Sequence, residues 1–176
     1  MQQNYFELFG LKPAFSLDLT QLETHFRAIQ SANHPDRFVT ASATEKLSAM
    51  QAATQANEAY LTLKNTANRA KYLLQLQGID AIAESNTAMP PAFLMQQLEW
   101  REEVADAEAQ KDIFGISKVL SSINQTAKTL ENQLLNQFEQ NDLAATTVST
   151  RQLVFVAKVS SDIQKTLDKL EDELDL

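Results

Sequence analysis

Glycine and proline are scarce in this chain, with only three glycines and four prolines in 176 residues. A fold rich in β-sheet needs many tight turns, and turns depend on these two residues. Alanine, glutamine, leucine and glutamate dominate instead, and all four are good helix formers. We therefore expect an all-α protein.

The composition also narrows the chemistry and the surroundings that we expect. The chain has no cysteine, so it can form no disulfide and offers no thiolate ligand to a metal. No apolar run reaches the roughly 18 residues of a membrane span, and the N-terminus lacks the basic start and apolar core of a signal peptide. We expect a cytoplasmic protein without membrane contact, bound metal or cofactor.

The net charge of −8 is distributed unevenly. Residues 1–76 hold seven Lys and Arg against six Asp and Glu, whereas residues 77–176 hold eight against seventeen. An acidic second half repels nucleic-acid phosphates, so we expect no nucleic acid as partner. The difference in charge between residues 1–76 and residues 77–176 suggests that the two regions bind different partners.

Hydrophobic periodicity and helix-breaking residues predict two groups of helices, separated by a linker at 77–90 that ends in Pro90-Pro91. Within 1–76 we expect helices at about 4–10, 18–33, 43–63 and 67–77. For the third of these, we expect Leu47, Met50 and Leu61 to mark one side. Within 91–176 we expect a three-helix bundle, with helices at about 91–110, 112–140 and 150–174 and a turn at 141–149.

The tripeptide His34-Pro35-Asp36 lies in the loop expected between two amphipathic helices. Proline ends the preceding helix and fixes the local backbone. Asp36 offers a carboxylate suited to a bidentate arginine, and His34 offers a directional donor and acceptor. The simpler interpretation is a helix-ending turn with a solvated aspartate. The surrounding order of short helix, long helix, loop, long helix and short helix favours a functional role.

Residues 1–76 resemble a J-domain in the order, length and register of their expected elements. The resemblance extends over nearly the whole chain to the HscB-type co-chaperones of iron–sulfur cluster assembly, and it rests on three strings: YFELFGL at 5–11, RAKYLL at 69–74 and FLMQQLE at 93–99. It implies a J-domain, a client-binding three-helix bundle, a DnaK-type (HscA-like) chaperone ATPase as one partner and an IscU-type scaffold as the other. His34, Pro35 and Asp36 would then stimulate the ATPase.

One departure from the J-domain pattern concerns the helix before the tripeptide. J-domains usually present several basic residues there, but this helix offers only Arg27, with Arg37 following in the loop. Asn33 also stands where an aromatic residue is common. We assign Arg27 and Arg37 to the chaperone-binding surface and expect weaker electrostatic steering than in general J-proteins.

The helix expected at 91–110 has two apolar faces. At about 100° per residue, Phe93 and Trp100 fall on one face and Leu94 and Leu98 on another, with acidic residues beside the second. A second apolar face suits either a partner site or a helix buried on both sides. The family resemblance assigns the following residues to scaffold binding: Leu94, Met95, Leu98, Glu99, Glu102, Asp106 and Phe155.

The sequence thus predicts a co-chaperone with no catalytic residue of its own, which stimulates a DnaK-type ATPase and delivers an IscU-type scaffold to it. Two alternatives remain. One is a J-protein whose bundle serves a different client. The other is a small helical enzyme that uses His34 and Asp36 in acid–base catalysis.

Overall fold

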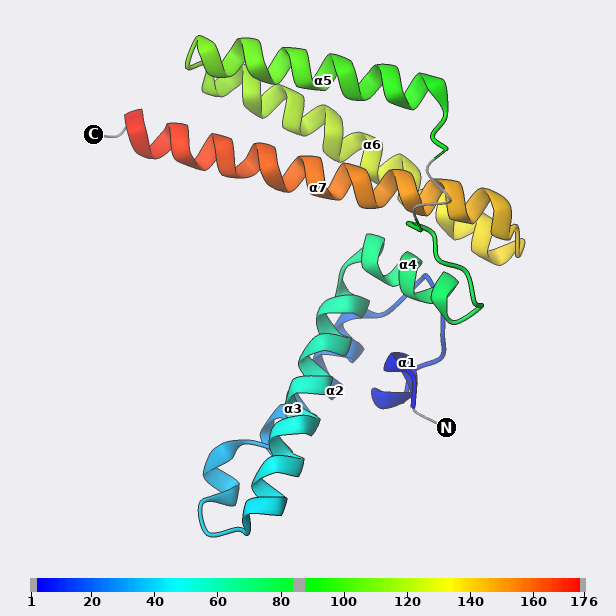
Figure 1. Cartoon of the computed structure of the whole chain (residues 1–176), viewed down its shortest axis with the longest axis vertical. Coiled ribbons are helices and arrows are strands. Elements are labelled where there is room, and N and C mark those ends of the chain that lie inside the picture. The colour runs from blue at the N-terminus through cyan, green and yellow to red at the C-terminus, as the bar shows by residue number, and fades with distance from the viewer. Residues whose placement is uncertain (1–2, 84–87, 175–176) are drawn as a thin grey trace. The chain divides into compact units, whose positions relative to one another are not determined.

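The computed structural model describes residues 3–83 and 88–174. The chain divides into two compact units, Met1–Leu76 and Gln77–Leu176, and every regular element in the described ranges is a helix (Figure 1). The all-α fold class is therefore confirmed. Part of the expected linker, residues 84–87, lies outside the described residues.

The first unit consists of four α-helices and one 3₁₀ turn. They are α1 (Tyr5–Leu8), α2 (Leu19–Ala32), the turn η1 (Pro35–Phe38), α3 (Ala43–Lys64) and α4 (Thr66–Gln75). Side-chain caps set the starts of the helices, because a helix leaves its first backbone N–H groups without partners. Asp18 caps α2, and Ser42 with Glu45 forms a capping box on α3.

Helices α2 and α3 lie side by side as a hairpin, with η1 and the following loop closing it at one end (Figure 1). The rings of Phe26 and Tyr60 stack across the pair with centroids 4.2 Å apart. Tyr5 stacks on Tyr72, which joins α1 to α4. His25 is half-buried, and its Nδ1 donates to the Phe9 carbonyl, so this histidine secures the chain between α1 and α2.

The apolar side expected for α3 was wrong. Leu47, Met50 and Leu61 are all more than half exposed. The buried side of the helix instead carries mostly small residues: Ala49, Ala56, Ala59 and Leu63. Alanines allow close approach to neighbouring helices, so the large side chains of α3 are left toward solvent.

The second unit contains α5 (Pro91–Ala109), α6 (Ile113–Glu139) and α7 (Leu143–Leu174). Helix α6 packs against both α5 and α7. The core is formed by the periodic residues of α6 and α7, among them Ile116, Ile123, Leu134, Val156 and Ile163. This spacing is typical of helices packed in a bundle.

Helix α7 begins at Leu143, seven residues before the expected start at 150. The chain reverses at Asn141, whose φ of 53° lies in the left-handed region that asparagine tolerates well. The Asp142 carboxylate then accepts from the Ala145 N–H, and the buried Thr146 hydroxyl donates to the Asp142 carbonyl. Small polar residues that suggested a loop are therefore the first turns of a helix.

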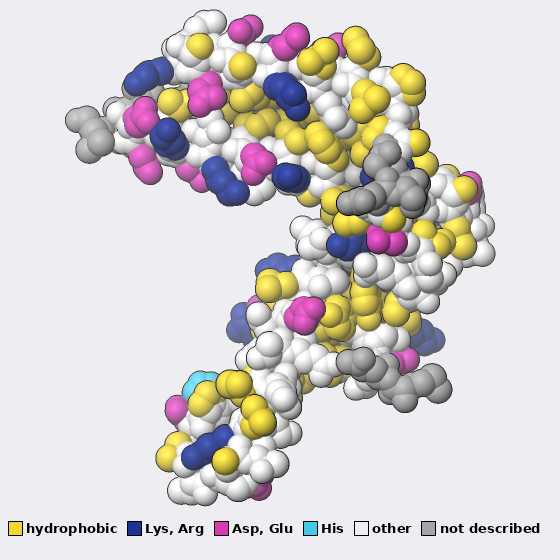
Figure 2. All heavy atoms as spheres, viewed as in Figure 1, with side chains coloured by type: hydrophobic (Ala, Val, Ile, Leu, Met, Phe, Trp, Pro, Cys, Tyr) yellow, Lys and Arg dark blue, Asp and Glu magenta, His cyan; other side chains and the backbone are white. Residues whose placement is uncertain are grey.

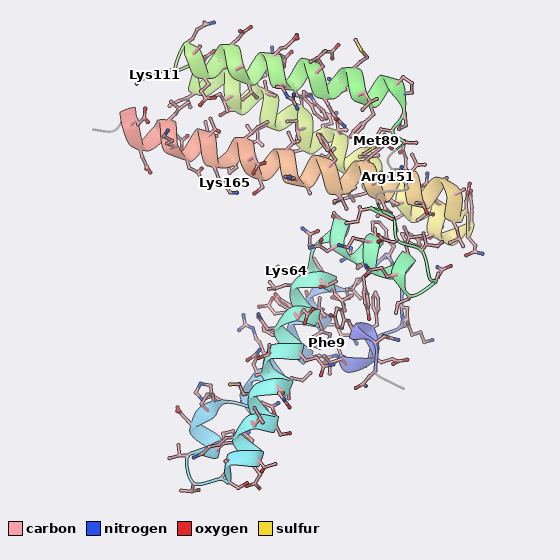
Figure 3. All side chains as sticks on the ribbon, in the orientation of Figure 1. Phe9, Lys64, Met89, Lys111, Arg151 and Lys165 are labelled. Atoms are coloured by element: carbon pink, nitrogen blue, oxygen red, sulfur yellow. The ribbon has the colours of Figure 1, made fainter. Side chains whose placement is uncertain are left out.

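Arg151 of α7 bonds to two residues of the segment that precedes α5, Ala81 and Ala88. This side chain is 6% exposed; its Nε donates to the Ala81 carbonyl at 2.9 Å, and its Nη1 donates to the Ala88 carbonyl. Figure 3 shows Arg151 near the part of this segment that carries Met89. A buried arginine that bonds two backbone carbonyls holds Ala81 and Ala88 against α7.

Candidate functional site

The His34-Pro35-Asp36 loop is ordered by its own hydrogen bonds. His34 caps the η1 turn: its Nδ1 accepts from the Asp36 N–H at 3.3 Å, and its carbonyl accepts from the Arg37 N–H at 3.0 Å. Pro35 occupies the first position of the turn, where a missing N–H costs nothing. Because Nδ1 accepts, the neutral imidazole carries its proton on Nε2, which can donate to a partner.

Both polar side chains of the tripeptide face solvent. The His34 side chain is 59% exposed and that of Asp36 is 87% exposed, with His34 Nδ1 and Asp36 Oδ2 3.6 Å apart. An exposed carboxylate on a fixed turn is well placed to accept a bidentate arginine from another protein. A catalytic dyad would instead be expected within a cleft that excludes water, and neither residue lines the groove beside them.

That groove, of about 650 Å³, lies between the end of α2, η1 and α3. Phe38, Val39 and Met50 contribute apolar lining, and Val39 and Met50 are each more than 60% exposed. Lys46 also lines it. An apolar surface therefore adjoins the tripeptide, and the sequence analysis, which placed Met50 only on one side of its helix, did not predict it.

Arg27 and Arg37, the two basic residues assigned to the chaperone-binding surface, both bond to groups within the protein. The Arg27 guanidinium pairs with the Glu23 carboxylate one turn away on α2, and the pair is largely exposed. Arg37 Nη1 donates to the Ser31 carbonyl at 3.5 Å. Asn33, at the position where an aromatic residue is common, ends α2 by donating from Nδ2 to the Ile29 carbonyl. Glu23 offsets the charge of Arg27, so Arg37 and Lys46 supply most of the positive field that this surface presents to a partner.

Helix α5 presents two different sides. Phe93 and Trp100 are buried at 7% and 2% exposure, whereas Leu94, Met95 and Leu98 are 50%, 59% and 47% exposed. Figure 2 shows hydrophobic side chains gathered over the earlier part of this helix. Leu94, Met95 and Leu98 are therefore not packed within the second unit, and they form an apolar face of α5. A partner can reach a contiguous apolar face here.

The predicted acidic residues lie exposed beside this apolar face. Glu99, Glu102 and Asp106 are all exposed, and Glu99 accepts a hydrogen bond from Gln96 on the same helix. Phe155 differs from the other predicted contact residues, because it is half-buried and its ring packs edge-on against Phe93 at 6.0 Å. The Phe155 side chain therefore packs between α5 and α7, and part of it remains exposed to solvent.

Clusters of three or more histidine, cysteine or carboxylate side chains suited to a metal ion are absent from residues 3–83 and 88–174. No helix in the same ranges is long and apolar enough to cross a membrane.

A helical hairpin closed by an exposed His-Pro-Asp turn, together with a separate bundle that presents an apolar helix face, defines the class of J-domain co-chaperones. Comparisons with known proteins agree. Residues 89–164 match the family model described as the HSCB C-terminal oligomerisation domain. The chain is 46% identical to a co-chaperone protein HscB homolog of Ralstonia nicotianae, with 96% of each chain covered.

Two further relatives show the same similarity over nearly the full length. An HscB homolog of Burkholderia thailandensis is 43% identical, covering 97% of this chain and 98% of the relative. The solved structure of chaperone HscB from Vibrio cholerae matches with a TM-score of 0.81 and 39% identity, covering 95% of this chain and 99% of that one. The chain belongs to the HscB family of co-chaperones.

Proposed function

We propose that the chain joins a DnaK-type, HscA-like chaperone to an IscU-type scaffold during iron–sulfur cluster assembly. The first unit would stimulate the chaperone ATPase through His34, Pro35 and Asp36, with Arg27 and Arg37 at the margin of the contact. The second unit would hold the scaffold. The protein would perform no chemistry itself, and thiolate ligands for the cluster would come from elsewhere.

The observation that carries this proposal is the exposure of Leu94, Met95 and Leu98 on a helix whose opposite side is already packed in the bundle. Exposed apolar side chains in one patch are typical of protein-binding surfaces, and a few of them usually supply most of the binding energy. Glu99, Glu102 and Asp106 add a negative margin that would steer a scaffold with a basic surface. Phe155 would complete the scaffold contact.

In this arrangement two contacts of modest affinity would be enough to bring chaperone and scaffold together. The tripeptide surface has few free basic charges, so its affinity for the ATPase should be modest. A scaffold held by the second unit and also recognised by the chaperone would raise the local concentration of each partner. The choice of chaperone partner would then depend on the bound scaffold, and the tripeptide would stimulate ATP hydrolysis.

Binding of a purified IscU-type scaffold, measured by isothermal titration calorimetry, tests the client assignment. The double variant Leu94→Ala, Leu98→Ala should weaken binding at least about tenfold, since each residue would be an interface anchor. Phe114→Ala is a matched control, because Phe114 is 79% exposed in the same unit but lies on α6. Unchanged affinity in the double variant would reject the α5 face as the scaffold site.

A further inference from the structure

A second hollow in the bundle lies between α5 and α7. Helix α6 packs against both of these helices, whereas α5 and α7 meet mainly through side chains such as Phe93 and Phe155. The resulting groove has a volume of about 330 Å³ and is lined on one side by Gln97, Trp100 and Val104 and on the other by Val159 and Ile163, among others. Figure 2 shows hydrophobic side chains along this trough.

Two hydrogen-bond donors in the groove lining have no acceptor. Trp100 Nε1 and Gln97 Nε2 are buried and find no partner among the described residues. A buried donor without an acceptor is unfavourable, so an acceptor from outside the chain, either a water molecule or an atom of a bound partner, is expected at each nitrogen. These nitrogens lie three residues apart on α5, on one side of the groove.

The margin of the groove carries an unpaired positive charge. Arg101 lines the groove and is exposed, and it forms no ion pair within the part of the chain that the structure describes. Two carboxylates, Glu108 and Asp162, also line the groove, and Asp162 pairs with Lys165. It is also the one basic residue of α5, which otherwise carries five carboxylates. Glu99, Glu102 and Asp106 favour a basic partner, whereas Arg101 favours an acidic group beside it.

Phe155 connects this groove to the surface proposed for the scaffold. It lines the groove, and it is also one of the residues assigned to scaffold binding. From these observations we infer that the α5–α7 groove receives a segment of the scaffold, with an apolar side chain in the trough, main-chain carbonyls facing Gln97 and Trp100, and a carboxylate beside Arg101. This inference rests on the proposed function and extends the scaffold contact around α5. A volume of this size falls at the small end of ligand sites, which span about 300–1,000 Å³.

Trp100 is the single tryptophan of the chain, which makes the groove directly observable. The full ¹⁵N-labelled chain is titrated with an unlabelled IscU-type scaffold, and the one indole N–H resonance is followed by NMR. The inference predicts a downfield shift of the indole proton on binding, because its nitrogen gains an acceptor. An indole resonance that stays unmoved at saturation would overturn the inference while leaving the exposed Leu94 and Leu98 face intact as the scaffold site.

Two variants test the groove by affinity. Arg101→Glu reverses the exposed charge, and Val159→Phe fills the trough from α7; each should raise the scaffold Kd about fivefold to tenfold. Lys118→Glu is the matched control for charge, since Lys118 is exposed on α6 away from the groove. Circular dichroism checks folding, and Arg101→Glu remains decisive if the filled variant is unstable.

The outcomes separate this inference from the proposed function. Loss of binding in Leu94→Ala, Leu98→Ala with unchanged Kd in both groove variants would reject the groove alone. A wild-type chain that does not bind the scaffold would reject both. Concentration-dependent self-association in analytical ultracentrifugation, with the indole shifting without scaffold, would identify a second copy of the chain as the occupant and overturn the inference.

Discussion

The backbone N–H of Asp36 donates a hydrogen bond to Nδ1 of His34, over 3.3 Å. This bond makes the imidazole part of the turn, because it determines which ring nitrogen stays free. The Asp36 carboxylate is left 87% exposed on a backbone that Pro35 and the η1 turn hold in place. The tripeptide therefore forms a small preorganised surface, which loses little entropy on docking.

Replacing the Asp36 carboxylate by an amide tests its proposed role as an arginine acceptor. Asp36→Asn keeps the shape of the side chain but removes its charge, so stimulation of the partner ATPase should fall about tenfold or more. The melting temperature should stay close to wild type, since the side chain is largely solvated. Steady-state ATP turnover gives the first quantity and circular dichroism the second. Glu139→Gln, at an exposed position at the end of α6, is the control because it removes the same charge from the second unit. If both variants stimulated the ATPase equally, the proposed role of the Asp36 carboxylate would be contradicted.

The acidic margin of α5 should govern the rate of scaffold association. In the triple variant Glu99→Gln, Glu102→Gln, Asp106→Asn, we expect the association rate at low salt to fall about threefold to tenfold. Its dependence on ionic strength should also flatten, because screening acts over about 10 Å at 0.1 M salt. Stopped-flow measurements across a salt series provide the test.

A matched control for that experiment removes the same number of charges from the end of α7. In Asp168→Asn, Glu171→Gln, Asp172→Asn, all three side chains are exposed in the wild-type protein. This variant should associate with a salt dependence close to that of wild type. Equal flattening in both variants would show that net charge, and not the α5 margin, steers the scaffold.

The Arg151 hydrogen bonds should stabilise the second unit strongly. Arg151→Met keeps much of the buried volume but leaves the Ala81 and Ala88 carbonyls without their donor. We expect the free energy of unfolding to drop by about 3 kcal/mol, given the usual cost of losing charged hydrogen bonds in a buried place. Urea unfolding followed by the fluorescence of Trp100, which lies in the same unit, measures it. Arg101→Met, at an exposed position, should change stability little.

The capping box of α3 predicts a pH dependence. Hydrogen bonds from the Ser42 hydroxyl and then from the Ser42 N–H lower the pKa of the Glu45 carboxyl below its ordinary value of 4.5. The ionised form is thus favoured in the folded state, so this contribution is present above that ordinary value and is lost as the pH falls through the folded pKa. The destabilisation caused by Glu45→Ala should therefore be larger at pH 7 than at pH 3, as measured by urea unfolding followed by circular dichroism. If Glu45→Ala destabilised the protein equally at pH 7 and pH 3, the proposed contribution of the Glu45 charge would be contradicted.

Much of the fold could be predicted from sequence patterns that each have one clear physical cause. The scarcity of glycine and proline predicted an all-helical chain, and the periodic apolar residues of α6 and α7 predicted their core faces, including Ile123 and Ile163. The two sides of α5 were also predictable, since helical geometry alone separates Phe93 from Leu94.

The predictions failed where the size or polarity of side chains did not indicate their burial or their secondary structure. In α3 the large apolar residues were expected to mark one side, but alanines such as Ala56 form the buried side. At the start of α7, Thr146 and Thr147 resembled a loop, but their hydroxyls donate to backbone carbonyls within the helix. The burial of Arg151 could not be predicted, because no sequence pattern specifies the carbonyls of Ala81 and Ala88 as its acceptors.

The most direct test of the proposed function is the ATP turnover of an HscA-type chaperone, measured with the protein alone and with the protein plus an IscU-type scaffold. We expect modest stimulation by the protein alone and stimulation more than additive when scaffold is present, and we expect His34→Gln to abolish both without loss of helical content. An ATPase rate that the protein leaves unchanged, with or without scaffold, would contradict the proposed function.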